Sequence, residues 1–425
     1  MRRKERDSQV FAAVAAAFLL FSILASLILA NDGNAIDWDR ARDLRQKEQR
    51  GDTLTEEEKA YLERAKQARL RGAQPAQQGK ATQAAESTGF VPVSDMKDQR
   101  YKGQAGGLYG EGRNTPPESH QAAARKELAK IQPLDAEGRP SKAGKIVLIS
   151  LGMSNTTQEF STFKKLADAD PSKSPSVVIV DCAQGGQAAH QWAYPDEGRN
   201  KQRPSPWTVM DERIAQAGVS PAQVQVVWLK QAQMGPAQLG EFPKHAESLR
   251  DDTADILRKL KTRFPNLRIA YLSSRIYAGY ATGPLNPEPY AYESVFSVRW
   301  LIEQQIKGES ALNHDSAKGE VKSPLLLWGP YLWADGVKGR KSDELVWKRE
   351  DLAGDGTHPS TSGREKVARM LLEFLKSDPN AKPWFLKESP RITSHHVTGT
   401  EDTQNDGDNA DQREEPPALA VGCGV

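Results

Sequence analysis

The sequence predicts an α/β fold in three layers around a mainly parallel sheet. Five short apolar runs rich in β-branched residues are typical of strands that are buried on both faces. Helical patterns alternate with these runs, as in parallel sheets covered by helices on both sides. The predicted strands are Lys145–Ser150, Ser176–Asp181, Gln223–Lys230, Arg268–Ser274 and Pro324–Leu332.

Three of the intervening segments carry a clear helical spacing. His245–Arg263 places Leu249, Ile256 and Leu260 on one face, and Tyr290–Lys307 and Ser362–Lys376 are also helical. Together with the strands they delimit one folded domain over residues 143–388.

Composition excludes several classes of protein. The 425 residues contain 58 Lys and Arg against 56 Asp and Glu, a net charge of +2. This balance argues against a nucleic-acid-binding protein, which needs a concentrated basic surface. Only two cysteines are present, Cys182 and Cys423, so a disulfide framework or a thiolate metal cage is excluded.

The N-terminus predicts export. Residues 1–9 carry Arg2, Arg3, Lys4 and Arg6, and Val10–Ala30 follows without a charged residue. A basic head before an apolar run is typical of a signal peptide, and a run of this length also suffices for a membrane anchor. Both interpretations of residues 1–30 stay open, and both place the rest of the chain outside the cytoplasm.

Three further segments flank the domain. Residues 31–72 are predicted to form a charged helical segment, in which Thr55 and Glu58 fit a capping box. Residues 73–142, rich in Gly, Gln, Ala and Pro, predict a disordered linker. Residues 389–425 predict a disordered acidic tail.

Ligands of parallel sheets bind beyond the carboxyl ends of the strands, and three motifs lie there. Ser154 follows the first strand and begins a helix, where it is either a nucleophile or a helix cap. Gly185-Gly186 follows the second strand, either as backbone donors to a ligand or as an ordinary turn. Asp355 and His358 precede the last helix, as a base with its orienting carboxylate or as a local turn.

Considered together, the three motifs favour nucleophilic catalysis. A serine becomes a good nucleophile when a base removes its proton, and the tetrahedral intermediate needs hydrogen-bond donors. Ser154, Asp355 and His358 supply the triad in the chain order Ser…Asp…His.

These motifs resemble the SGNH (GDSL-like) hydrolase superfamily, in particular its carbohydrate O-acetylesterase branch. Gly152-Met153-Ser154-Asn155 is similar to the Gly-Gln-Ser-Asn block of that branch. Gln184-Gly185-Gly186 with Trp192 is similar to its second block, and Asp355-Gly356-Thr357-His358-Pro359 to its last block. The resemblance covers about residues 145–380.

The resemblance implies a flavodoxin-like α/β/α fold, with Ser154 as nucleophile, His358 as base and Asp355 as its partner. It also implies an oxyanion hole formed by the backbone N–H groups of Ser154 and Gly186, and activity without a metal or cofactor. Family members hydrolyse esters, often acetyl esters of sugars.

The third block departs from the family, which has an Asn or a Gln donor there. Gln231 is the expected replacement, one residue out of register, and Lys230 is an alternative cation near the oxyanion or an acidic substrate. Trp192 and Arg275 are expected, with Lys230, to contact the substrate.

The sequence therefore predicts an exported serine esterase that removes acyl groups from carbohydrate through a Ser154 acyl-enzyme. The expected partners are an acylated carbohydrate and, if residues 10–30 stay uncleaved, a membrane; nucleic acid is not expected. Two alternatives stay open. One is an acyltransferase that uses the same site, and the other is a non-catalytic glycan-binding protein with a degenerate site.

Overall fold

The structure, a computed structural model, describes residues 36, 40, 41, 44, 47, 48, 52–72, 85–197 and 204–387. The chain divides into two units, Met1–Lys387 and Glu388–Val425, and every described residue belongs to the first. The predicted signal or anchor and the predicted acidic tail lie outside the described residues. No helix among the described residues combines the length and the apolar character that a bilayer crossing needs.

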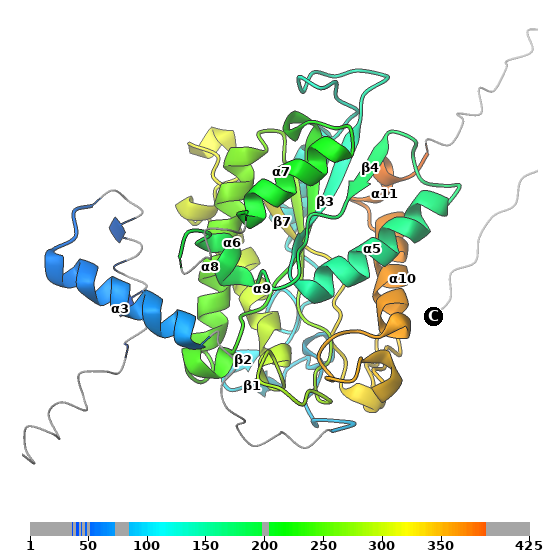
Figure 1. The fold of residues 1–425 in the computed structure, drawn as a ribbon. Helices are drawn as coiled ribbons and strands as arrows, with labels where there is room; N and C mark the ends of the chain where they lie inside the picture. Colours follow the sequence, from blue (N-terminus) through cyan, green and yellow to red (C-terminus); the bar gives the residue numbers. More distant parts are fainter. Residues whose placement is uncertain are drawn as a thin grey trace, which may run out of the picture. The chain divides into compact units, whose positions relative to one another are not determined.

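The centre of the fold is a sheet of five parallel strands in the order β4-β3-β5-β6-β7 (Figure 1). Numbered along the chain, this is the order 2-1-3-4-5 of the flavodoxin-like arrangement, in which the strand order reverses beside the first strand. The strands are β3 (Ile146–Gly152), β4 (Val177–Val180), β5 (Val224–Lys230), β6 (Ile269–Ser273) and β7 (Leu325–Trp328). All residues of β3, β5, β6 and β7 are buried, as expected for a parallel sheet covered on both faces.

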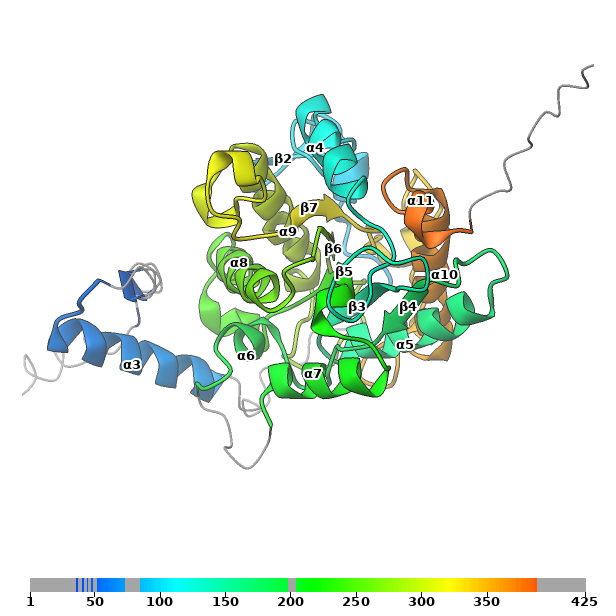
Figure 2. The same ribbon diagram turned by 90° about the horizontal axis from the view of Figure 1, so that it is seen from above.

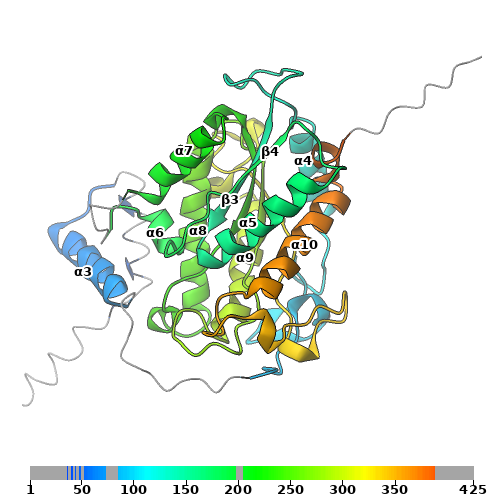
Figure 3. The same cartoon turned by 45° about the vertical axis from the view of Figure 1, so that its right-hand side comes forward.

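Helices cover both faces of the sheet and complete three layers. α5 (Ser154–Ala169) and α10 (Thr361–Ser377) lie side by side on one face (Figure 3). The opposite face carries α7 (Pro206–Gln216), α8 (Lys244–Arg263) and α9 (Tyr290–Ile306) (Figure 2). The predicted three-layer α/β/α fold is thus confirmed.

Shorter elements connect these layers. Further helices are α3 (Glu56–Gly72), α4 (Glu118–Leu128), α6 (Ala189–Ala193) and α11 (Lys382–Phe385). Single 3-10 turns occur at η1 (Val93–Asp95), η2 (Pro221–Gln223), η3 (Pro236–Leu239), η4 (Ser310–Leu312), η5 (Ser316–Lys318), η6 (Gly336–Lys338) and η7 (Arg349–Asp351). A two-stranded antiparallel ribbon is formed by β1 (Arg100–Tyr101) and β2 (Gln104–Ala105).

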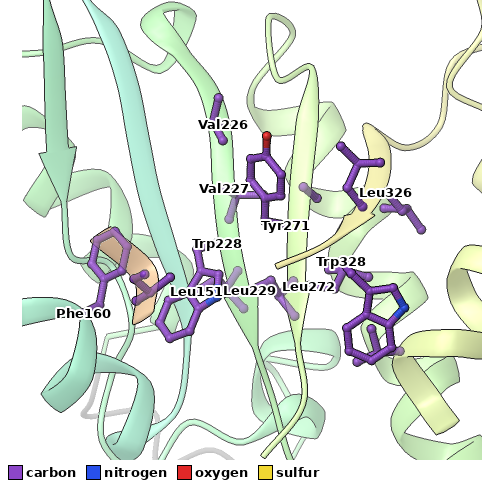
Figure 4. Packing of buried hydrophobic residues seen from close by; sticks show 14 of the residues in the cluster. Leu151, Phe160, Val226, Val227, Trp228, Leu229, Tyr271, Leu272, Leu326 and Trp328 are labelled. Atoms are coloured by element: carbon purple, nitrogen blue, oxygen red, sulfur yellow. The ribbon is translucent and has the colours of Figure 1, made fainter. Parts of the chain in front are cut away.

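Aromatic side chains pack α5 onto the sheet. Phe160 of α5 stacks on Trp228 of β5 with ring centroids 5.7 Å apart, and both side chains are buried with Leu151 (Figure 4). Each such side chain contributes about 1.5–3 kcal/mol by leaving water. This packing fixes the start of α5, where Ser154 lies, against the ends of β3 and β5.

The predicted linker is wrong over residues 85–142. This segment contains β1, β2 and α4, and its Val93, Met96 and Ala124 are buried in the same core as the sheet. The carboxylate of Asp335 also accepts hydrogen bonds from the Thr88 N–H and the Ser87 hydroxyl, at 2.7 and 2.6 Å. The Gly- and Pro-rich composition indicated disorder, but a few apolar residues at irregular spacing are enough to hold the segment on the domain.

The predicted capping box at the start of α3 is confirmed. The Glu58 N–H donates to the Thr55 hydroxyl at 3.2 Å, and the Thr55 N–H donates to the Glu58 carboxylate at 2.9 Å. The helix has a small core of its own, which includes Leu44, Tyr61 and Leu62.

Candidate active site

Ser154 lies at the first position of α5, directly beyond the carboxyl end of β3. The turn between them is tight, because a Cβ on Gly152 would lie 2.3 Å from the Lys230 carbonyl oxygen and 2.3 Å from the Thr156 hydroxyl. Glycine at this position therefore allows β3 to approach β5 closely. Ser154 is left at the positive end of the helix dipole, which favours negative charge developing beside it.

The structure brings Ser154, His358 and Asp355 together in one chain of hydrogen bonds. The Ser154 hydroxyl lies 2.8 Å from His358 Nε2, and His358 Nδ1 lies 2.5 Å from Asp355 Oδ2. Both distances are those of direct hydrogen bonds. Residues that are 204 positions apart in the sequence thus meet at the carboxyl edge of the sheet.

The protonation of this chain follows from the Asp355 carboxylate. Burial alone would raise the pKa of Asp355, but hydrogen bonds from His358 and from the Thr357 N–H outweigh it and hold the pKa below its usual value. An ionised carboxylate only accepts hydrogen bonds, so His358 Nδ1 carries a proton, and in the neutral imidazole Nε2 is then the acceptor for the Ser154 hydroxyl. This is the state in which His358 acts as a general base towards Ser154.

The turn that carries Asp355 and His358 is held by its own backbone. Asp355 Oδ1 accepts from the N–H groups of Thr357 and His358, both at 3.0 Å. Gly356 has a φ of 64°, and a Cβ there would lie 1.8 Å from the Tyr280 carbonyl oxygen. The turn therefore requires glycine at position 356, both for its backbone angle and for its contact with Tyr280.

Two side chains support this turn from beneath, and the sequence prediction did not give them this role. Asn155 Nδ2 donates to the Thr357 carbonyl oxygen at 2.9 Å, and Arg275 Nη2 approaches the same oxygen at 3.4 Å. Asn155 and Arg275 are each 1% exposed. The position of Asn155 beside Ser154 was the available signal, because a polar side chain at the start of a helix buried against a sheet needs a partner.

The turn after β4 brings Gly185 beside Ser154. A Cβ on Gly185 would lie 4.0 Å from Ser154 Cβ, and Gly186, with a φ of 75°, faces open space. Among the described residues, none accepts a hydrogen bond from the N–H of Ser154, Gly185 or Gly186. Backbone N–H groups that have no partner are the kind of donor that stabilises an oxyanion in serine hydrolases.

Gln231 lies elsewhere. It is 3% exposed and lines a small cavity of about 10 Å³ together with Leu249 of α8 and Leu301 of α9. Neither its amide nitrogen nor its amide oxygen has a hydrogen-bond partner among the described residues. Successive residues of an extended chain point to opposite faces, so the offset of one residue turns Gln231 towards the layer of α8 and α9. The structure does not support the predicted third donor.

Lys230, Arg275 and Trp192, the predicted substrate contacts, are all buried beneath the site. Lys230 forms an ion pair with Glu159 of α5, and both side chains are 0% exposed. The Trp192 ring is buried, and its Nε1 donates to the Gly152 carbonyl oxygen at 3.3 Å. These side chains support the ends of β3 and β5, and their buried positions do not favour contact with a substrate.

Metal ligands do not gather in the described part of the chain. No group of three or more His, Cys, Asp or Glu side chains there has the geometry to hold an ion. Cys182, one residue beyond the predicted second strand, is buried, and burial raises the pKa of its thiol well above its usual value.

No protein-family model and no curated protein matches the chain. Among solved structures, the crystal structure of the protein YxiM from Bacillus subtilis is similar, with 14% sequence identity and a TM-score of 0.30. The match covers 56% of this chain and 57% of the YxiM chain, so the similarity spans little more than half of each. A likeness this distant carries no argument about activity, which is inferred below from the site alone.

Proposed function

We propose that this protein is a serine ester hydrolase of the SGNH type that acts through a Ser154 acyl-enzyme. The observation that carries the proposal is the hydrogen-bond chain from Ser154 through His358 to Asp355, at 2.8 and 2.5 Å. A serine in contact with a neutral imidazole that is oriented by a carboxylate is set up for acyl transfer.

The first half of the reaction forms the acyl-enzyme. The Ser154 oxygen attacks the ester carbonyl carbon while its proton moves to His358 Nε2. The N–H groups of Ser154 and Gly186 hold the resulting oxyanion, and each such donor contributes about 100–1,000-fold in rate. The intermediate then collapses, the alcohol leaves, and His358 returns the proton to the leaving oxygen.

The second half releases the acid. Water attacks the acyl carbon of the Ser154 ester while His358 Nε2 takes its proton, and collapse of the second intermediate restores the Ser154 hydroxyl. Asp355 keeps the imidazole in the required tautomer and stabilises the imidazolium in both halves. No metal or cofactor is needed in either half.

The substrate class is proposed from the sequence motifs. Resemblance of the blocks around Ser154, Gly186 and His358 to carbohydrate O-acetylesterases supports an acetylated glycan as substrate. Basic residues 2–6 followed by the apolar run 10–30 support export of the enzyme.

The test is covalent labelling of the full chain with a fluorophosphonate probe. We expect wild-type protein to be labelled, Ser154→Ala to be unlabelled, and His358→Ala to be labelled at least 100-fold more slowly. Ser161→Ala is the matched control, because Ser161 lies on the same helix but its hydroxyl donates to Asp181 at 2.7 Å and has no histidine partner. Absence of labelling in folded wild-type protein contradicts the proposal.

A second assay separates hydrolysis from transfer. p-Nitrophenyl acetate is supplied with and without a sugar acceptor, and both acetate and acetylated sugar are quantified. Acetate as the main product at high acceptor concentration supports the hydrolase. Acetylated sugar as the main product supports the acyltransferase.

A further inference from the structure

A second polar cavity lies at the end of the sheet opposite Ser154. Its volume is about 230 Å³, and its wall includes residues that precede β6 and begin β7, among them Arg268 and Leu325. Lys261, near the end of α8, and Lys130, just after α4, also line it. Because Ser154 follows the carboxyl end of β3 and this cavity adjoins the amino ends of β6 and β7, the two sites are separate.

Positive charge dominates this cavity. Lys130, Lys261 and Arg268 face a single carboxylate, that of Glu127. The Glu127 carboxylate already binds Lys130 Nζ at 2.5 Å, and it lies 3.9 Å from Arg268 Nη1. Lys261 has no carboxylate partner among the described residues, and its Nζ donates to two backbone carbonyl oxygens at 2.8 Å.

Two nitrogen atoms in the wall are buried without a hydrogen-bond partner. These are Arg268 Nε and His314 Nδ1, and none of the described residues accepts from either. A buried donor that lacks a partner is costly, and native proteins normally satisfy it with protein, water or a ligand. Both atoms belong to residues that line the same cavity.

The electrostatics of the cavity favour a bound anion. Burial, together with repulsion from Arg268 and Lys130, lowers the pKa of Lys261 to about 8, although Glu127 opposes the shift. Burial also lowers the pKa of His314. A negative charge in the cavity would relieve the repulsion between the cations and return the pKa of Lys261 towards its ordinary value.

We propose that this cavity binds an oxyanion of the phosphate or sulfate class. Arg268 supplies a planar guanidinium, Lys261 and Lys130 supply ammonium groups, and His314 supplies a ring N–H. Donors from four different segments suit a tetrahedral ion that accepts bonds in several directions better than a flat carboxylate. The volume is below the 300–1,000 Å³ or so that is typical of drug-sized ligands, so the site takes a free ion or one phosphate group of a larger molecule.

Titration of the full chain with inorganic phosphate, sulfate and glycerol phosphate tests this proposal. Binding is measured by isothermal calorimetry and by the rise in Tm, both at constant ionic strength with chloride. We expect saturable binding of one ion per chain. Arg268→Gln should weaken it at least tenfold, and His314→Gln severalfold. Lys165→Gln on α5 is the control and should bind as wild type does.

Tighter binding of glycerol phosphate than of inorganic phosphate assigns the site to an organic phosphate, and equal binding assigns it to the free ion.

Phosphate could also occupy an oxyanion hole at Ser154, whose backbone donors Ser154→Ala would keep. Weaker phosphate binding in Arg268→Gln and His314→Gln, which line only this cavity, therefore separates the two sites whether or not the hydrolase proposal holds. Phosphate binding that is absent, that chloride reproduces, or that is equally tight in Arg268→Gln and His314→Gln overturns the proposal. If Arg268→Gln does not fold, His314→Gln decides, because His314 Nδ1 makes no hydrogen bond that the substitution would remove.

Discussion

The ion pair between Lys230 and Glu159 makes a sharp prediction about stability beneath the active site. Lys230→Met removes the ammonium group but keeps the length of the side chain, and it leaves the Glu159 carboxylate inside the protein. Both side chains are 0% exposed, and Glu159 Oε1 lacks a partner even in the wild type. Burial raises the pKa of Glu159 despite the attraction of Lys230, which is the largest opposing effect, and the smaller attraction of Arg275 and Arg364.

The size of the expected loss of stability follows from the burial of both charges. Removing one partner of a fully buried ion pair costs about 3–5 kcal/mol, because the remaining charge is desolvated and unpaired. For a domain of this size, 1 kcal/mol corresponds to about 2–4 °C in Tm, so we expect Lys230→Met to lower Tm by about 10 °C. The double variant Lys230→Met with Glu159→Leu removes both charges and should recover most of this loss, since apolar replacements of buried pairs are often neutral.

Urea unfolding of the two single variants and the double variant measures the coupling directly. The control is Lys164→Met, which breaks the Lys164–Asp168 pair on the same helix, where the two side chains are 43% and 41% exposed. We expect the control to cost less than about 1 kcal/mol. A cost below 1 kcal/mol for Lys230→Met, or a double variant as unstable as the sum of the singles, refutes the reasoning.

Three further predictions concern the turn that carries Asp355 and His358, and a buried carboxylate elsewhere in the domain. Gly356→Ala should cost more than about 2 kcal/mol and abolish fluorophosphonate labelling, because φ is 64° and the new Cβ meets the Tyr280 carbonyl oxygen. Gly354→Ala, whose Cβ meets open space, is the control, and equal unfolding midpoints would contradict the prediction. Asn155→Ala leaves the Thr357 carbonyl oxygen without its closer donor, at 2.9 Å. The rate of Ser154 labelling should fall at least tenfold, and the dependence of this rate on pH should broaden. An unchanged rate with an unchanged pH dependence argues against a positioning role for Asn155. Burial raises the pKa of Glu288 to about 7, against hydrogen bonds that lower it. The folded state therefore binds more protons than the unfolded state between about pH 4.5 and 7, and stability falls as the pH rises through this range by up to about 3 kcal/mol. Glu288→Gln should lose this dependence in urea unfolding at pH 5 and pH 8, and an unchanged slope contradicts the assignment.

The sheet was predictable because its signal is local. Each predicted strand run contains an observed strand or most of it, for example Gln223–Lys230 against Val224–Lys230. A fully buried parallel strand is apolar at every position, and few other structures give such short runs between turn residues. The triad was predictable for a similar reason, since the carboxyl ends of parallel strands meet at one edge and bring Ser154 and His358 together.

The segment 85–142 was not predictable in the same way. α4 has buried side chains at His120, Ala124 and Glu127, two of which are polar, so no apolar stripe marks it as a packed helix. Its stability comes from tertiary contacts such as His120 Nε2 with the Leu326 carbonyl oxygen at 2.8 Å. Contacts of this kind are absent from any local pattern, and composition alone indicated disorder instead.

The direction of the side chains at the end of β5 explains why the structure does not bring Lys230 or Gln231 to the serine, and it has a consequence for catalysis. Lys230 points to α5 and Gln231 to the layer of α8 and α9, so neither reaches the serine, although both follow the correct strand. Under the proposed mechanism, an oxyanion at Ser154 would then have only the backbone donors of Ser154 and Gly186. Loss of a donor costs about 100–1,000-fold, so a site with two donors is a slower esterase than one with three, unless the substrate supplies the missing hydrogen bond. A hydroxyl next to the ester on a sugar ring could donate that bond, which favours carbohydrate esters over simple acetates. Hydrolysis of an acetylated sugar that exceeds hydrolysis of p-nitrophenyl acetate in kcat, and that falls when the neighbouring hydroxyl is removed, is the result this reasoning requires.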